Sequence, residues 1–115
     1  MMQRSTVYVY LRDRSEVGRI DNLIQDLDMV GEIREGDITR AIVDAAQWSI
    51  PPNFLIVEMP EDGSIIQAVE RLADAAPEGN TYLIIVGSDN DVRLYRDLKN
   101  IGVSDYIMLP IDTEE

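Results

Sequence analysis

Apolar and polar positions along the chain form a repeating pattern in which a short apolar run is followed by an amphipathic segment. Five apolar runs predict strands, at residues 6–11, 29–33, 54–57, 82–86 and 106–109. The runs at 6–11, 54–57 and 82–86 have almost no polar break, which is typical of strands that are buried on both faces. The pattern therefore predicts a parallel sheet.

Between these runs, apolar residues recur at intervals of three and four, which predicts helices with one buried face. The four predicted faces consist of Val17, Ile20, Ile24 and Leu27; of Ile38, Ala41, Ile42, Ala45 and Trp48; of Ile65, Val69, Leu72 and Ala76; and of Leu94, Tyr95, Leu98 and Ile101. Strands that alternate with amphipathic helices predict an α/β fold with an open parallel five-stranded sheet, helices on both faces and right-handed crossovers. A fifth helix would be expected after residue 109, so it is missing or truncated, or the sequence is cut from a longer protein.

Local signals mark the helix ends. Asp13 with Glu16, and Ser64 with Gln67, have the spacing of capping pairs. The prolines at 51–52 are expected to end the second helix, because proline cannot continue the hydrogen-bond ladder. Gly102 is expected to close the fourth helix.

The composition excludes several classes of function. The chain has 22 acidic and 10 basic residues and a net charge of −12, which would repel a nucleic-acid backbone. Cysteine and histidine are absent, so disulfides, thiolate metal sites and the commonest general base are excluded. No apolar run approaches the ~20 residues that span a bilayer. We therefore expect a cytoplasmic protein without cofactor, metal, nucleic-acid partner or direct membrane insertion.

Functional groups in such sheets gather just past the carboxyl ends of the strands. The residues that close the first, third, fourth and fifth strands are Arg12 or Asp13, Glu58, Gly87 or Ser88, and Leu109. The lone carboxylate among the apolar neighbours of the third strand makes Glu58 the first candidate for a site residue.

The segments Leu-Ile-Val-Glu-Met-Pro-Glu-Asp-Gly at 55–63 and Val-Ser-Asp-Tyr-Ile-Met-Leu-Pro at 103–110 resemble the receiver domain of bacterial response regulators, and the order of elements agrees over essentially the whole chain. The resemblance implies a CheY/flavodoxin-like fold. In typical receivers an acidic pair follows the first strand, a phosphorylated Asp ends the third, a Thr or Ser ends the fourth, and a Lys precedes a Pro after the fifth.

The chain departs from this pattern at each position. Glu58 stands at the phospho-acceptor position but is one methylene longer than Asp, which would move the nucleophilic oxygen by roughly 1 to 1.5 Å. Arg12 falls within the acidic pair in either register, so at most one metal-binding carboxylate, Asp13, remains. Gly87 stands in place of the hydroxyl residue, with Ser88 one place off.

Leu109 replaces the lysine, and an aliphatic side chain cannot pair with a phosphoryl group. The pocket is therefore degenerate, and a switch driven by phosphorylation is not expected. We interpret Glu58 as a solvated acid at a strand end or as a cap of the following helix.

A longer stretch, from residue 87 to 106 and on to 111, is similar to the N-terminal atypical receiver domain of CpaE/TadZ-family pilus assembly proteins. The matching elements are Asn-Asp-Val at 90–92, Leu-Tyr-Arg at 94–96 and Gly-Val-Ser-Asp-Tyr at 102–106. The resemblance implies that residues 1–115 are one receiver-like domain at the start of a longer protein with a ParA/MinD-like ATPase, whose phosphate-binding loop does not occur here. It also implies a role in assembly and polar localisation of the tight-adherence (Flp-type) pilus secretion machinery, through contacts with its proteins or with polar markers.

The helix predicted from 91 to 101 is the candidate interaction surface, because receivers commonly pair or signal through this region. Its basic residues fall at spacings of three and share one face, which is unusual in an acidic protein. The candidate interface residues are Arg93, Tyr95, Arg96, Lys99, Asp105 and Tyr106. The basic face could meet Asp97 or Asp105 of a second copy in a homodimer, or it could be a solvated face paired within the chain. Tyr95 fits either the core or an interface.

Two other functions fit the sequence less well. The first is a phospho-acceptor response regulator that uses Glu58 or Asp62 with magnesium. The second is a small-ligand module that uses the acidic loop at 88–91, which has no support beyond the position of the loop.

Overall fold

The computed structural model describes residues 5–12, 14–76, 80–88 and 91–109. Its elements follow the predicted alternation. In chain order they are β1 (Thr6–Leu11), the 3₁₀ turn η1 (Arg14–Glu16), α1 (Val17–Asp26), β2 (Val30–Glu35), α2 (Ile38–Ala45), β3 (Phe54–Glu58), α3 (Ile65–Ala75), β4 (Tyr82–Gly87), α4 (Val92–Asn100) and β5 (Asp105–Met108). The region where a fifth helix was expected lies outside the described residues, as do Asp13 and most of the turn at 77–80.

All five strands are parallel and lie in the order β2-β1-β3-β4-β5, which confirms the predicted open sheet. β3 is the central strand, and the order reverses between β1 and β3, which are neighbours. Tyr10 pairs with Val57, and Glu58 pairs with Val86, so the carboxyl ends of β1, β3 and β4 meet at one edge. We call this the carboxyl edge; the opposite edge, where the strands begin, is the amino edge.

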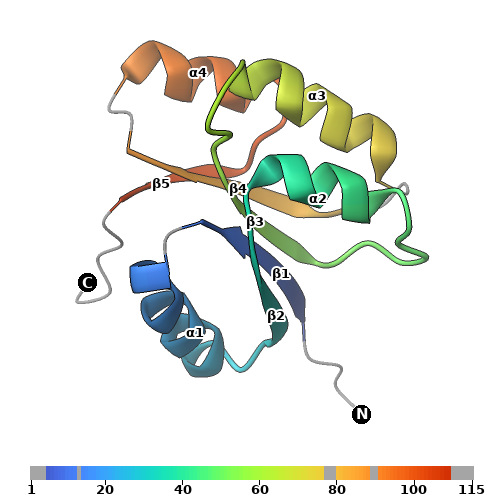
Figure 1. Cartoon of the computed structure of the whole chain (residues 1–115), viewed down its shortest axis with the longest axis vertical. Coiled ribbons are helices and arrows are strands. Elements are labelled where there is room, and N and C mark those ends of the chain that lie inside the picture. Colours follow the sequence, from blue (N-terminus) through green and yellow to red (C-terminus); the bar gives the residue numbers. More distant parts are fainter. Residues whose placement is uncertain (1–4, 13, 77–79, 89–90, 110–115) are drawn as a thin grey trace.

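Helices cover both faces of the sheet, as predicted. Figure 1 shows α2, α3 and α4 on one side of the strands and α1 on the other. Successive residues of β1 face opposite sides: Tyr10 packs in the core beneath α2, α3 and α4, whereas Val9 and Leu11 pack in the core beneath α1. The inner strands β1, β3 and β4 are thus mostly apolar on both faces, which explains their nearly unbroken apolar runs, whereas the edge strand β2 is largely exposed.

Several helix ends differ from the predictions. α2 ends at Ala45, well before the prolines. A tight turn follows, in which the Trp48 amide donates a hydrogen bond of 3.2 Å to the Ala45 carbonyl. Trp48 therefore lies beyond the helix, where its ring packs against Tyr8 with centroids 5.2 Å apart. Leu27 and Ile101 were expected in the core but are exposed, because α1 and α4 end one residue earlier and these residues form their C-caps.

Side chains cap the starts of α2 and α3, and the cap of α3 is the predicted pair of Ser64 and Gln67. The Ser64 hydroxyl accepts a hydrogen bond of 3.3 Å from the Gln67 amide at the start of α3. The Asp37 carboxylate accepts one of 2.8 Å from the Thr39 amide at the start of α2. Both side chains satisfy amide groups that a helix cannot satisfy itself.

A buried tyrosine fastens α2 to β1. The hydroxyl of Tyr10 donates a hydrogen bond of 2.8 Å to the Asp44 carboxylate, and Arg34 and Arg40 lie 3.6 and 3.8 Å from the same carboxylate. Burial and the contact with Asp44 both raise the pKa of Tyr10 far above its usual value, because both disfavour the phenolate. The phenol thus remains a neutral donor throughout the ordinary pH range.

The substitution Tyr10→Phe should lower the free energy of unfolding by about 1–3 kcal/mol at neutral pH, since it removes a hydrogen bond to the partly buried, charged Asp44 carboxylate. In the wild type, Tyr10 ionises in the unfolded chain at about pH 10 but not in the folded chain, so its stabilising contribution falls as the pH rises above that value. The difference in the free energy of unfolding between wild type and variant, measured by urea unfolding, should therefore narrow from about pH 9 to about pH 11, around the pKa of ~10 of a free tyrosine. Tyr82→Phe, at an exposed position, is the control; a constant difference would contradict the assignment.

Candidate functional site

Glu58 and Arg12 meet at the carboxyl edge of the sheet. The backbone amide of Arg12, which follows β1, donates a hydrogen bond of 2.9 Å to Oε1 of Glu58. Its guanidinium Nη2 lies 3.0 Å from Oε2 of the same carboxylate. Both oxygens of Glu58 are therefore engaged by one residue of the neighbouring strand.

Our interpretation of Glu58 as a solvated acid or helix cap is wrong. The residue is only 7% exposed, and Ser64 rather than Glu58 caps α3. Glu58 is the last residue of β3 and pairs with Val86, so it belongs to the sheet and not to the loop that follows. A carboxylate this deeply buried needs a charged partner, and Arg12 supplies one.

The guanidinium of Arg12 joins three further groups of the same edge. Nη2 donates a hydrogen bond of 2.8 Å to the carbonyl of Met59, Nε lies 3.4 Å from Asp37 at the start of α2, and Nη1 lies 3.9 Å from Glu61. One guanidinium thus lies within ion-pair distance of three carboxylates: one at the end of β3, one in the loop after β3 and one at the start of α2. Sequence reasoning treated Arg12 only as an obstacle to a metal ion and missed this role. The available signal was a base and an acid that each directly follow the apolar part of their strand.

Gly87 stands where receivers carry a hydroxyl residue, and the structure leaves no room for a side chain there. A Cβ atom at this position would collide with the Met59 sulfur and would lie 2.7 Å from the Tyr106 hydroxyl. The Tyr106 hydroxyl itself lies 3.6 Å from that sulfur. Met59 and Tyr106 therefore fill the space that a Thr or Ser would need.

The other residues predicted at the strand ends have separate surroundings. Leu109 is partly buried and packs with the apolar cluster beneath α1, and its amide donates a hydrogen bond of 2.8 Å to the Gly87 carbonyl. Ser88 is exposed. Asp13 lies outside the described residues, as does most of the acidic loop at 88–91.

The basic residues of α4 share one exposed face, opposite the buried Leu98. Lys99 donates a hydrogen bond of 2.7 Å to the Ser104 carbonyl and lies 5.9 Å from the centre of the Tyr95 ring, which is exposed rather than part of the core. Within the described part of the chain, no carboxylate forms an ion pair with Arg93 or Arg96.

The remaining two candidate interface residues lie on β5. Asp105 is exposed and accepts a hydrogen bond of 2.8 Å from the amide of Tyr106. Tyr106 is partly buried, and its hydroxyl is directed to Met59 at the carboxyl edge. Tyr106 therefore links the α4–β5 side of the domain to the site around Glu58.

Two searches of the described residues were negative. No cluster of three or more acidic side chains there has the arrangement of a metal site. None of the described helices has the length and apolar character needed to cross a membrane.

The order of strands and the helical layers define the receiver, or CheY-like, fold. The receiver domain of DrrB activated by beryllofluoride superposes with a TM-score of 0.71 over 96% of this chain and 88% of that domain, at 14% sequence identity. At that identity the likeness concerns the fold alone.

Two pilus assembly proteins are more similar. CpaE from Caulobacter crescentus has a TM-score of 0.82 and 26% identity, over 94% of this chain and 84% of that chain. CpaE2 from Sinorhizobium meliloti, described as a putative pilus assembly protein, has a TM-score of 0.78 and 26% identity, over 93% of this chain and 89% of that chain. The resemblance to the CpaE receiver-like domain is therefore confirmed at the level of structure. No protein-family model and none of the curated proteins matches the sequence.

Replacing Arg12 by Ala should lower the free energy of unfolding by about 1.5–3 kcal/mol, because it leaves the buried Glu58 carboxylate without its charged hydrogen-bond donor. Chemical denaturation at pH 7 measures the change. Arg14→Ala is the matched control: its pair with Glu35 at 2.9 Å is fully exposed, so the loss should be barely measurable. Equal effects of the two substitutions would contradict a special role for Arg12.

Proposed function

We propose that the chain is a receiver-like protein-interaction domain that acts without phosphoryl transfer and serves the assembly of a pilus secretion machinery. The observation that carries the proposal is the pairing of Arg12 with Glu58. This pairing argues against the alternative function, a receiver that accepts a phosphoryl group.

Phosphoryl transfer to a carboxylate needs a free nucleophilic oxygen and a cation that holds the incoming phosphoryl oxygens. Here Oε1 of Glu58 accepts a hydrogen bond of 2.9 Å from the Arg12 amide, and Oε2 forms an ion pair of 3.0 Å with the Arg12 guanidinium. The guanidinium also occupies the space between Glu58, Asp37 and the Met59 carbonyl. The packing of Met59 and Tyr106 around Gly87 leaves no place for the hydroxyl residue that receivers use.

The similarity to CpaE proteins supports the second part of the proposal. At 26% identity over nearly the whole chain, this resemblance is stronger in sequence than that to the DrrB receiver, at 14%. We therefore propose that residues 1–115 form the receiver-like domain of a longer protein that carries a ParA/MinD-like ATPase. The domain would contribute to placing the machinery, often at a cell pole, by binding other proteins.

Acetyl phosphate with magnesium should leave the mass of the chain unchanged, and beryllofluoride should leave its amide NMR spectrum unchanged. The matched variant combines Arg12→Asp with Glu58→Asp, which restores an acidic residue and the shorter acceptor; it tests whether removal of the internal pair alone admits the ligand. A receiver that accepts phosphate serves as the positive control. A phosphoryl adduct on Glu58 or Asp62 of the wild type would reject the proposal in favour of the response-regulator function.

We propose the basic face of α4 as the surface that binds partner proteins. Arg93 and Arg96 carry exposed charges that the described carboxylates do not pair, in a chain whose net charge is −12. Arg is favoured in protein interfaces because its planar fork binds carboxylates with little loss of side-chain freedom. The face therefore fits an acidic surface on a partner.

Combined Arg93→Glu and Arg96→Glu substitutions should sharply reduce the number of pili when placed in the gene of the organism that encodes the chain, with the protein level unchanged. The control combines Arg14→Glu and Arg71→Glu, which makes the same change of charge at exposed positions outside α4. Pilus counts by electron microscopy and immunoblots of the protein are the measurements. Normal pili in the α4 variant would contradict the assignment of this face.

A further inference from the structure

The described part of the amino edge carries little charge. It consists of the segments 5–6, 27–30, 48–53, 80–82 and 101–105, in which Asp28 and Asp105 are the charged residues. The ammonium group of Lys99 reaches it from α4, through a hydrogen bond of 2.7 Å to the Ser104 carbonyl. The carboxyl edge, by contrast, gathers Arg12, Asp37, Glu58 and Glu61 around one site. In a chain with a net charge of −12, two copies repel each other least where charge is sparse.

The same edge exposes large apolar side chains. Five of the nine exposed large apolar residues of the described chain belong to it: Leu27, Val30, Ile50, Tyr82 and Ile101. Ile50 is 79% exposed and Tyr82 is 60% exposed, the latter stacked on Phe54 with ring centroids 5.4 Å apart. Apolar side chains gathered on one surface mark an interaction site, whereas single ones need no explanation.

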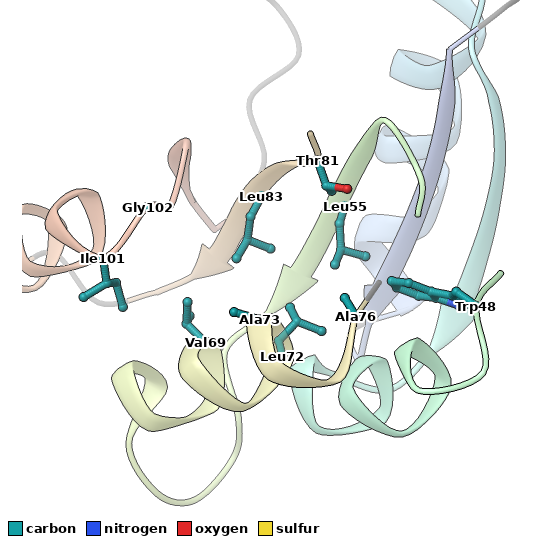
Figure 2. A pocket seen from close by; sticks show the side chains of 10 residues that line it. All are labelled: Trp48, Leu55, Val69, Leu72, Ala73, Ala76, Thr81, Leu83, Ile101 and Gly102. Atoms are coloured by element: carbon teal, nitrogen blue, oxygen red, sulfur yellow. The ribbon is translucent and has the colours of Figure 1, made fainter. Parts of the chain in front are cut away.

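A pocket of about 260 Å³ also belongs to this edge, between the ends of α3 and α4 and the starts of β3 and β4. Figure 2 shows Trp48 at one end of it and Ile101 at the other, with Leu72 and Leu83 between them. Its lining contains no charged side chain, and the small residues Ala73 and Gly102 leave it unfilled. The pocket is large enough for a branched aliphatic side chain, and all of its lining residues except Thr81 and Gly102 have apolar side chains.

We infer that two copies of this chain associate through their amino edges, with Ile50 of each copy seated against the pocket of the other. A twofold interface requires that one surface carry both the projecting groups and the recess that receives them. This edge carries both, and its sparse charge makes the electrostatic repulsion between two copies weaker here than elsewhere on the surface. The pairing uses a different surface from the α4 face, so it stands or falls independently of the proposed function.

The dependence on salt separates this pairing from one that uses α4. Salt screens the repulsion between two acidic chains, so association through the amino edge should strengthen as the ionic strength rises. Association through ion pairs between the basic face of α4 and acidic groups of a second copy should weaken under the same conditions.

The inference is tested with the 115-residue chain by sedimentation velocity at protein concentrations up to about 1 mM and at low and high salt. The wild type should form a dimer that salt strengthens. Ile50→Asp should weaken it at least about tenfold, the loss expected when a buried branched side chain becomes a charge. The emission of Trp48, the sole tryptophan, should shift to shorter wavelength with concentration in the wild type and remain unchanged in Ile50→Asp.

Two further variants make the test specific. Ala73→Leu places a larger side chain at the exposed rim of the pocket and should also weaken the dimer. Val43→Asp makes the same kind of change as Ile50→Asp at an exposed position of α2 and should leave the dimer intact. A wild type that is monomeric at every concentration overturns the inference. The inference is also overturned if the dimer persists in Ile50→Asp but dissociates at high salt, or dissociates in the double variant Arg93→Glu, Arg96→Glu.

Discussion

The ion pair between Arg12 and Glu58 is the constraint on which the carboxyl edge of this domain depends. A carboxylate buried at the end of a central strand is unstable without a cation, and the chain supplies that cation from the adjacent strand at 3.0 Å. The same guanidinium binds the Met59 carbonyl and approaches Asp37, so the end of β1, the start of α2 and the loop after β3 are held together. A group that in receivers would react has become a structural anchor.

The packing around Gly87 is consistent with this change. Because Met59 follows Glu58 directly, the contact of its carbonyl with Arg12 fixes the backbone from which its sulfur reaches Gly87 and the Tyr106 hydroxyl. The departures at positions 12, 58 and 87 therefore form one connected arrangement rather than three separate losses.

The predicted fold agreed with the structure because its signals are local. Apolar runs gave the strands, and the spacing of residues such as Ile65, Val69 and Leu72 gave the buried helix faces. The errors fell at element ends, where local patterns carry least information. Trp48 continued the helical spacing of α2 but lies beyond its end because its ring packs on Tyr8, a contact between segments distant in sequence.

The sequence by itself determined the order of strands and helices along the chain and the receiver resemblance, since each follows from residue type and spacing along one chain. The tertiary structure decided that Glu58 is buried against Arg12, that Met59 and Tyr106 occupy the space beside Gly87, and that exposed apolar residues from four segments lie at the amino edge. These depend on which strands lie side by side. Residues separated by 46 positions, such as Arg12 and Glu58, become neighbours only when β1 and β3 pair in the sheet.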